Sequence, residues 1–153
     1  MNRAYKFRIY PTGEQEILIH KTFGCCRFVY NHMLADKKQA YEETKKTIKI
    51  TPAAYKKEYP WLKEVDSLAL ANEQLHLERA YRKFFEESKI GFPKFKSKHG
   101  SRKSYTTNVV NGNIRISEGK LRLPKVGTVK IRLHREIPAG WTLKSVTVSM
   151  DPS

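Results

Sequence analysis

The spacing of the hydrophobic residues changes twice along the chain, and this change constrains the fold more than any other feature. Near the start, Tyr5, Phe7 and Ile9 alternate with charged residues, which is the pattern of a half-buried β-strand. Helical spacing then continues to about residue 88, and alternation returns after residue 105. Because a single strand needs partners, we expect the first strand to pair with strands near the C-terminus.

A long helix is predicted directly after the first strand. Thr12 and Gln15 form a capping-box pattern, and a helical stretch follows from 13 to 44. Gly24 lies inside this stretch, where glycine costs up to ~1 kcal/mol relative to alanine. We therefore expect a break, a kink or a close helix contact at Gly24.

A second long helix follows a connector that contains two prolines. The connector is expected to hold a short helix near 52–58. Asp66 or Ser67 then caps a helix that extends to about residue 88. Apolar residues at helical spacing predict a buried stripe on this helix, formed by Leu70, Leu77, Tyr81 and Phe84, with Leu68 and Leu75 beside it.

Short alternating segments in the C-terminal third predict several β-strands separated by turns. These segments are NIRIS (113–117), KLRLP (120–124), TVKIRLH (128–134) and LKSVTVSM (143–150), and NGN at 111–113 is one of the turn signals. The predicted fold class is α+β, with a small antiparallel barrel or curled sheet and a helical insertion after its first strand. The expected parts are a barrel from residues 1–11 and 104–153, a helical insertion from 12–92 and a basic connector from 93–103.

The net charge of +15 implies a polyanionic partner. Nucleic acid is the first candidate, and an anionic membrane surface is the main alternative. Residues 1–87 carry 16 basic and 12 acidic side chains, whereas residues 88–153 carry 14 basic and 3 acidic ones. A solvated face usually mixes both signs, but the predicted strands carry almost no acid. The cations that alternate with core residues on these strands are Lys6, Arg8, Arg115, Lys120, Arg122, Lys130 and Arg132.

The segment KIGFPKFKSKHGSRKSY at 89–105 contains six lysines and arginines and no acid. It connects the helical insertion to the later strands. We expect Phe92 and Phe95 to anchor it, with Lys94 and Lys96 turned outward. We interpret it as a half-anchored basic clamp whose part from 97 to 103 becomes ordered on a phosphate backbone.

No catalytic centre and no metal site are predicted. Most acids lie on helices with basic neighbours three or four positions away, as surface ion pairs do, and only three acids follow residue 88. Cys25 and Cys26 are adjacent, which suits neither a shared metal ion nor a disulfide, so we interpret both as core residues. The N-terminus is unlike a signal peptide, and no apolar stretch approaches the ~20 residues of a membrane span. We expect a soluble cytoplasmic protein of undetermined oligomeric state.

Six phrases follow one another along the chain: AYKFRIYPTGEQE, KTFGCCRFVYN, WLKEVDSLALANEQLHLERAYRKFF, GFPKFKSK, SYTT and LRLPKVGTVKIRLHR. Together they resemble, in order, the N-terminal half of TnpB. This is the OrfB-type family of small bacterial and archaeal insertion sequences, long labelled transposases with a helix-turn-helix. The resemblance covers essentially the whole chain.

The resemblance implies the recognition half of an RNA-guided DNA endonuclease. In the family, an oligonucleotide-binding-like (wedge) barrel is interrupted after its first strand by a helical recognition domain. These parts bind the guide RNA scaffold, a short motif that flanks the target DNA, and the guide–target heteroduplex. The family's RuvC-type nuclease domain, with its divalent metal, and its zinc ribbon match no part of this sequence, so we expect no catalytic activity and no cofactor in this chain.

The expected binding residues fall into two sets. Residues expected to hold phosphates are Lys6, Arg8, Arg27, Arg79, Arg82, Lys83, Lys94, Lys96, Lys98, Arg102, Lys103, Arg115, Arg122, Lys130 and Arg132. Residues expected near the flanking DNA motif are Ser67, Ala71, Asn72, Gln74, Val110 and Asn111, with Asn31 a further candidate of the right type.

Two alternatives stay open, one for the role of the aromatic residues and one for the function. Aromatic residues such as Phe28 and Trp61 suit base stacking as well as core packing. The alternative function is a sequence-specific regulator with a helix-turn-helix in residues 13–44, or a transposase remnant, either acting without RNA.

Overall fold

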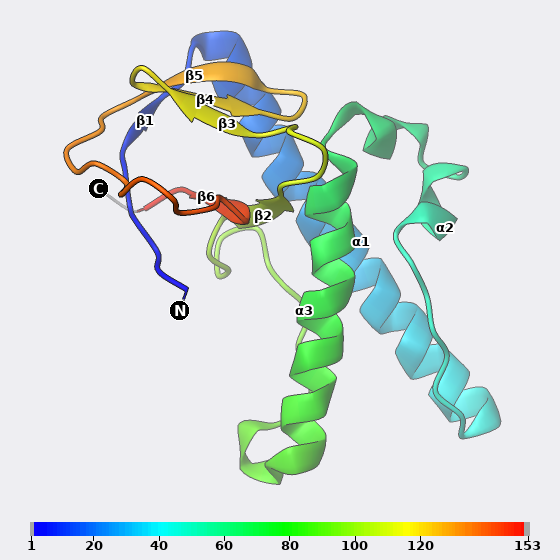
Figure 1. The fold of residues 1–153 in the computed structure, drawn as a ribbon. Helices are drawn as coiled ribbons and strands as arrows, with labels where there is room; N and C mark the ends of the chain where they lie inside the picture. The colour runs from blue at the N-terminus through cyan, green and yellow to red at the C-terminus, as the bar shows by residue number, and fades with distance from the viewer. Residues whose placement is uncertain (1, 152–153) are drawn as a thin grey trace.

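The computed structural model describes residues 2–151 and shows an α+β protein (Figure 1). Its strands gather at one end of two long helices, which extend away from them. The helices are α1 (Gly13–Thr44), α2 (Ala53–Lys56) and α3 (Ser67–Glu86), with 3-10 turns η1 (Pro60–Glu64) and η2 (Ser88–Ile90). The strands are β1 (Ile9–Tyr10), β2 (Ser104–Asn108), β3 (Arg115–Ser117), β4 (Lys120–Leu123), β5 (Gly127–Ile131) and β6 (Ser145–Ser149). Within residues 2–151, no helix combines the length and the apolar composition that a membrane span requires.

The strands form two antiparallel sheets. A four-stranded sheet has the order β1-β5-β4-β3, and β2 pairs with β6 in a two-stranded sheet. In the first sheet, Ile9 lies opposite Ile131 and Tyr10 lies opposite Lys130. The prediction that the first strand pairs with a C-terminal strand is therefore confirmed.

Helix α1 begins and ends at the predicted residues. The Thr12 hydroxyl accepts a hydrogen bond from the Gln15 backbone N–H at 3.3 Å, and the Gln15 side chain accepts one from the Thr12 backbone N–H at 2.9 Å. The capping box is thus formed. Gln15 Nε2 also donates to the carbonyls of Val126 and Thr128, at 3.3 and 2.7 Å. One side chain therefore caps the helix and fastens it to the start of β5.

Helix α1 continues through Gly24, so the predicted break is wrong. The predicted close helix contact is also wrong, because a Cβ at Gly24 would meet no atom within 4 Å outside its own helix. Packing within the described chain therefore does not explain why a glycine occupies this position.

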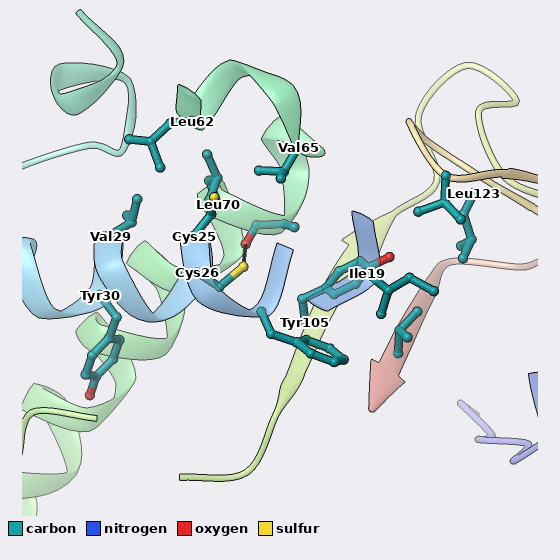
Figure 2. Packing of buried hydrophobic residues seen from close by; sticks show 14 of the residues in the cluster. Ile19, Cys25, Cys26, Val29, Tyr30, Leu62, Val65, Leu70, Tyr105 and Leu123 are labelled. Atoms are coloured by element: carbon teal, nitrogen blue, oxygen red, sulfur yellow. Dashed lines mark hydrogen bonds between the residues drawn. The ribbon is translucent and has the colours of Figure 1, made fainter. Parts of the chain in front are cut away.

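The main core lies between α1 and α3. Cys25, Cys26 and Val29 are at most 2% exposed, which confirms that both cysteines are core residues. Figure 2 shows these three side chains close to Leu70 of α3. The Cys26 thiol donates to the Ala69 carbonyl at 3.6 Å, and burial raises its pKa. Burial of each large aliphatic side chain in such a core contributes roughly 1.5–3 kcal/mol.

Helix α3 starts after Asp66, whose side chain accepts a hydrogen bond from the Leu68 backbone N–H at 2.9 Å. The predicted stripe is fully buried only in its first half. Leu70 and Leu77 are at most 1% exposed, whereas Tyr81 and Phe84 are half-buried. The second half of α3 lies away from the strands (Figure 1), so the sheet does not cover it.

The sequence does not predict strand β2, because most of its residues are polar. Tyr105 and Thr107 nevertheless alternate on a buried side, at 2% and 0% exposed. Asn72 of α3 donates to the Thr106 carbonyl at 2.9 Å and to Asn108 Oδ1 at 2.6 Å. Pairing with β6 and hydrogen bonds from α3 thus hold this segment, although it has little apolar alternation.

Replacing Gln15 with alanine tests the connection between α1 and β5. We expect Gln15→Ala to lower the free energy of unfolding by about 1–2 kcal/mol, because the variant loses a cap and two hydrogen bonds to the sheet. Gln39→Ala is the matched control, since Gln39 bonds only along its own helix, to Glu43; its effect should stay within about 0.5 kcal/mol. Urea denaturation measures both values, and equal losses would contradict this role of Gln15.

Candidate nucleic-acid interface

The outward side of the four-stranded sheet carries exposed cations on β3, β4 and β5, and another directly before β1. Arg115 of β3 lies opposite Arg122 of β4. The Arg132 backbone N–H donates to the Arg8 carbonyl at 2.9 Å, so the pairing of β1 with β5 continues one residue pair beyond the strands. We call this set the basic sheet face. It consists of Arg8, Arg115, Lys120, Arg122, Lys130 and Arg132, all of them exposed.

The register of the basic sheet face places like charges directly opposite one another. Besides the arginine pair, Lys120 lies opposite Lys130. Like charges in these positions destabilise a sheet, where cross-strand pairs are worth roughly 0.2–1 kcal/mol each. Across the described part of the chain, none of the six cations has an acidic ion-pair partner. A bound polyanion would remove this repulsion, so the face suits a phosphate backbone.

The connector from 93 to 103 is fixed partly as predicted. Pro93 is buried, and Phe92, although 38% exposed, meets two aromatic rings of α3 edge-on, with centroids 5.3 and 5.4 Å apart, whereas Phe95 is 51% exposed. Asn31 of α1 also holds the connector: its Nδ2 donates to the Lys96 carbonyl at 2.9 Å, and its Oδ1 accepts from the Lys96 N–H at 2.8 Å. The Asn31 amide, which is expected from the sequence to read a base, therefore already uses its nitrogen and its oxygen in hydrogen bonds to the connector.

Lys96 points inward, contrary to the prediction, and Lys94 is exposed as expected. Lys96 Nζ lies 3.4 Å from a carboxylate oxygen of Glu73, whose side chain is 3% exposed. It also lies 4.2 Å from the ring centroid of Tyr30. His76 Nδ1 is 3.4 Å from the same carboxylate oxygen. A buried carboxylate needs a partner, so Lys96 stabilises the attachment of the connector to α3.

A hollow of about 200 Å³ lies between α1 and the connector. We call it the connector hollow. The turn that the connector makes at 97–101 is held by side chains, since Ser97 Oγ accepts from the Gly100 N–H at 2.8 Å and Ser101 Oγ accepts from the Ser97 N–H at 3.1 Å. The predicted cations that line it are Arg27, Lys96, Lys98, Arg102 and Lys103, and Glu73 is the one acid in its lining.

Two further predicted cations are joined by one acid. Lys6 Nζ lies 2.8 Å from Asp151 Oδ2, and Arg102 Nη2 lies 3.5 Å from Asp151 Oδ1. The hydrogen bond and charge of Lys6 hold the pKa of the Asp151 carboxyl below its ordinary value. These contacts link the N-terminal segment to the connector next to β6. Lys6 and Arg102 are therefore partly neutralised.

The remaining predicted cations lie on the second half of α3. Arg79, Arg82 and Lys83 are all exposed. Arg79 and Lys83 also line a shallow groove of about 450 Å³ with the segment from Ile90 to Lys94. The structure thus distributes the predicted phosphate-binding residues over the sheet, the connector and α3.

The residues predicted to lie near the flanking DNA motif do not all face solvent. Ser67 and Ala71 are exposed at the start of α3, and Gln74 bonds to Glu78 at 3.0 Å. Asn72 is 7% exposed, and its amide is used by the contacts with β2 described above. The structure therefore places Asn72 where it positions α3 rather than where it meets a ligand directly.

A tight turn next to Asn72 carries the other two predicted residues. Val110 is 48% exposed, and Asn111 and Gly112 have φ angles of 52° and 71°, which confirms the turn predicted from NGN. Asn113 was not singled out by the sequence, but its Nδ2 donates to the Asn108 carbonyl at 3.0 Å. Asn72, Asn108 and Asn113 thus form a hydrogen-bonded link from α3 to the turn.

The described residues form an α+β fold in which the helices separate the first strand of a sheet from its other strands. Exposed cations lie on the outer side of that sheet. A family model described as a helix-turn-helix domain of the OrfB type matches residues 1–46. In the structure this region contains β1 and the single continuous helix α1, so residues 13–44 do not contain the turn between two helices that the alternative function requires.

Three relatives extend the comparison. A protein of Streptomyces pristinaespiralis named "Putative RNA-guided DNA endonuclease" is 35% identical over 99% of this chain, and one of Escherichia coli named "Putative RNA-guided DNA endonuclease InsQ" is 33% identical over 96%. The virulence protein VsdF of Salmonella dublin is 41% identical over 65% of this chain and 97% of its own length. The chain belongs to the OrfB/TnpB family. It spans 39% and 37% of the lengths of the two endonuclease relatives.

Replacing Lys96 with methionine tests its structural role. We expect Lys96→Met to lower the free energy of unfolding by about 2–3 kcal/mol, because the buried Glu73 carboxylate loses its charged partner. Lys94→Met is the matched control, with the same change at an exposed neighbour, and should stay within about 0.5 kcal/mol. Chemical denaturation at neutral pH compares the two. Equal stability of both variants would show that Lys96 does not hold the connector.

Proposed function

We propose that this chain is the nucleic-acid-binding part of a TnpB-like RNA-guided DNA endonuclease. The like-charged register of the basic sheet face is the observation that carries the proposal. A sheet that needed only solubility would gain from acids opposite Arg122 and Lys130, and this sheet has cations there. The phosphates of guide RNA, or of a guide–target heteroduplex, supply the missing negative charge.

The two sheets are proposed to be parts of one wedge-type barrel, which the helical insertion interrupts after β1. The connector hollow lies where the insertion returns to the strands, so it extends the phosphate-binding surface from the sheet towards α1. The exposed start of α3 and the Val110–Asn113 turn lie next to each other through the asparagine link. This part is the proposed approach to the DNA motif that flanks the target.

The proposal assigns binding rather than cleavage to these residues. The cations of the basic sheet face have no described ion-pair partner, whereas the acids with described ion pairs, such as Glu64, Glu73 and Asp151, are each held by a lysine. Cleavage with a divalent metal is assigned to the part of the relatives that lies outside the match. The proposed binding partners of this chain are therefore guide RNA and target DNA.

Removing charge from the basic sheet face should weaken binding and reduce its salt dependence. The double variant Lys120→Gln, Arg122→Gln is expected to lower the magnitude of the slope of log K against log salt by about 1–2, since each lost phosphate contact removes about 0.7–0.9. Fluorescence anisotropy with a short RNA–DNA hybrid, between about 50 and 200 mM salt, measures this slope.

Lys46→Gln with Lys49→Gln is the matched control, because it removes the same charge from exposed positions outside the sheet. Its slope should remain close to that of the unmodified protein. Equal slopes for the two double variants would contradict the sheet as the phosphate-binding surface. An affinity that does not change with salt would contradict the proposed function as a whole.

The nucleic acid that co-purifies with the protein distinguishes the proposed function from the RNA-independent alternative. We expect RNA that ribonuclease removes and deoxyribonuclease does not. A protein that is free of nucleic acid after purification, yet binds one duplex DNA sequence tightly, would instead be a DNA-binding regulator.

A further inference from the structure

Gly24 lies between two hollows on the same side of α1. One is the connector hollow, and the other is a groove of about 450 Å³. Gly24 and Arg27 line both of them. Since a Cβ at Gly24 would have no neighbour within 4 Å outside its own helix, no side chain separates the two hollows at this point.

The second groove has an aromatic wall, and we call it the aromatic groove. Phe28, His32 and Trp61 line it, with Cys25 beside them. The Phe28 ring stacks on His32 with centroids 3.9 Å apart and meets Trp61 edge-on at 4.7 Å. Trp61 is 39% exposed, so part of its ring is open to a ligand. The volume falls within the ~300–1,000 Å³ typical of sites for small organic groups.

The charge around the aromatic groove is positive. Lys21 and Arg27 stand on its rim, and none of the residues that line it is acidic. Lys21 is paired with Glu64, whereas Arg27 has no ion-pair partner among the described residues. An aromatic wall beside an unpaired guanidinium complements a group that is flat and apolar on one side and anionic on the other. A nucleotide has this chemistry.

We propose that the aromatic groove binds the base of one unpaired nucleotide, while Arg27 and the connector hollow hold the phosphates next to it. The strand would cross α1 at Gly24, where a long side chain would stand in its way, although a methyl group has room. The proposal rests on the proposed function and adds to it a site for single-stranded nucleic acid.

Trp61 provides a direct readout. The Trp141→Phe variant leaves Trp61 as the only tryptophan, because the chain contains two. We expect a short single-stranded oligouridylate to quench its fluorescence and to bind at least ~5-fold more tightly than an abasic oligomer of the same length, since stacking favours each base. The abasic oligomer presents the same phosphates without bases.

Two substitutions at Gly24 supply the matched pair in the Trp141→Phe background. Gly24→Ala adds only a methyl group in open space and should keep the quenching and the preference for bases, in a helix that is slightly more stable. Gly24→Leu fills the crossing point and should abolish both, while circular dichroism shows an unchanged helix content. Loss of both in Gly24→Leu alone is the expected result.

The outcomes separate the site from the broader function. Equal, salt-dependent binding of the two oligomers, or unchanged quenching in Gly24→Leu, would overturn the nucleotide site and leave the phosphate-binding function intact. Failure of both oligomers and of the RNA–DNA hybrid to bind at low salt would overturn the site together with the proposed function.

Discussion

The pairing of β1 with β5 is the interaction on which the rest of the structure depends. It places Ile9 opposite Ile131, so that both long helices lie, along the sequence, between two paired strands of one sheet. The entropy cost of closing so long a segment rises only slowly with its length, and Gln15 adds a second link from the start of α1 to the start of β5. The position of α1 relative to the sheet is therefore fixed at its first turn.

The same register also determines the charge of the surface. Because side chains alternate along a strand, a register that turns Val129 and Ile131 into the core must turn Lys130 and Arg132 outward. A shift by one residue would bury these cations, so the core and the basic sheet face are stabilised or lost together. The proposed binding surface is thus a consequence of the fold rather than a separate feature placed on it.

The sequence predicts those parts of the fold that depend on local patterns. It predicts the bounds of α1, the capping box and the burial of both cysteines, because spacing and capping are local properties. It does not predict β2, whose place depends on β6 and on Asn72, or the inward turn of Lys96, which depends on Glu73 more than twenty positions away. The cations of the site could be named from sequence, but the opposition of Arg115 to Arg122 and the open surface at Gly24 require the three-dimensional arrangement.

The central claim, that the basic sheet face holds a phosphate backbone, is tested most directly by chemical footprinting of lysine amines. Acetylation of the protein with and without a bound RNA–DNA hybrid, read by mass spectrometry, reports each lysine separately. Protection of Lys120 and Lys130 by the hybrid, with Lys46 and Lys49 modified equally in both states, is the predicted result. Unchanged modification of Lys120 and Lys130 under conditions in which the hybrid is bound would contradict the claim.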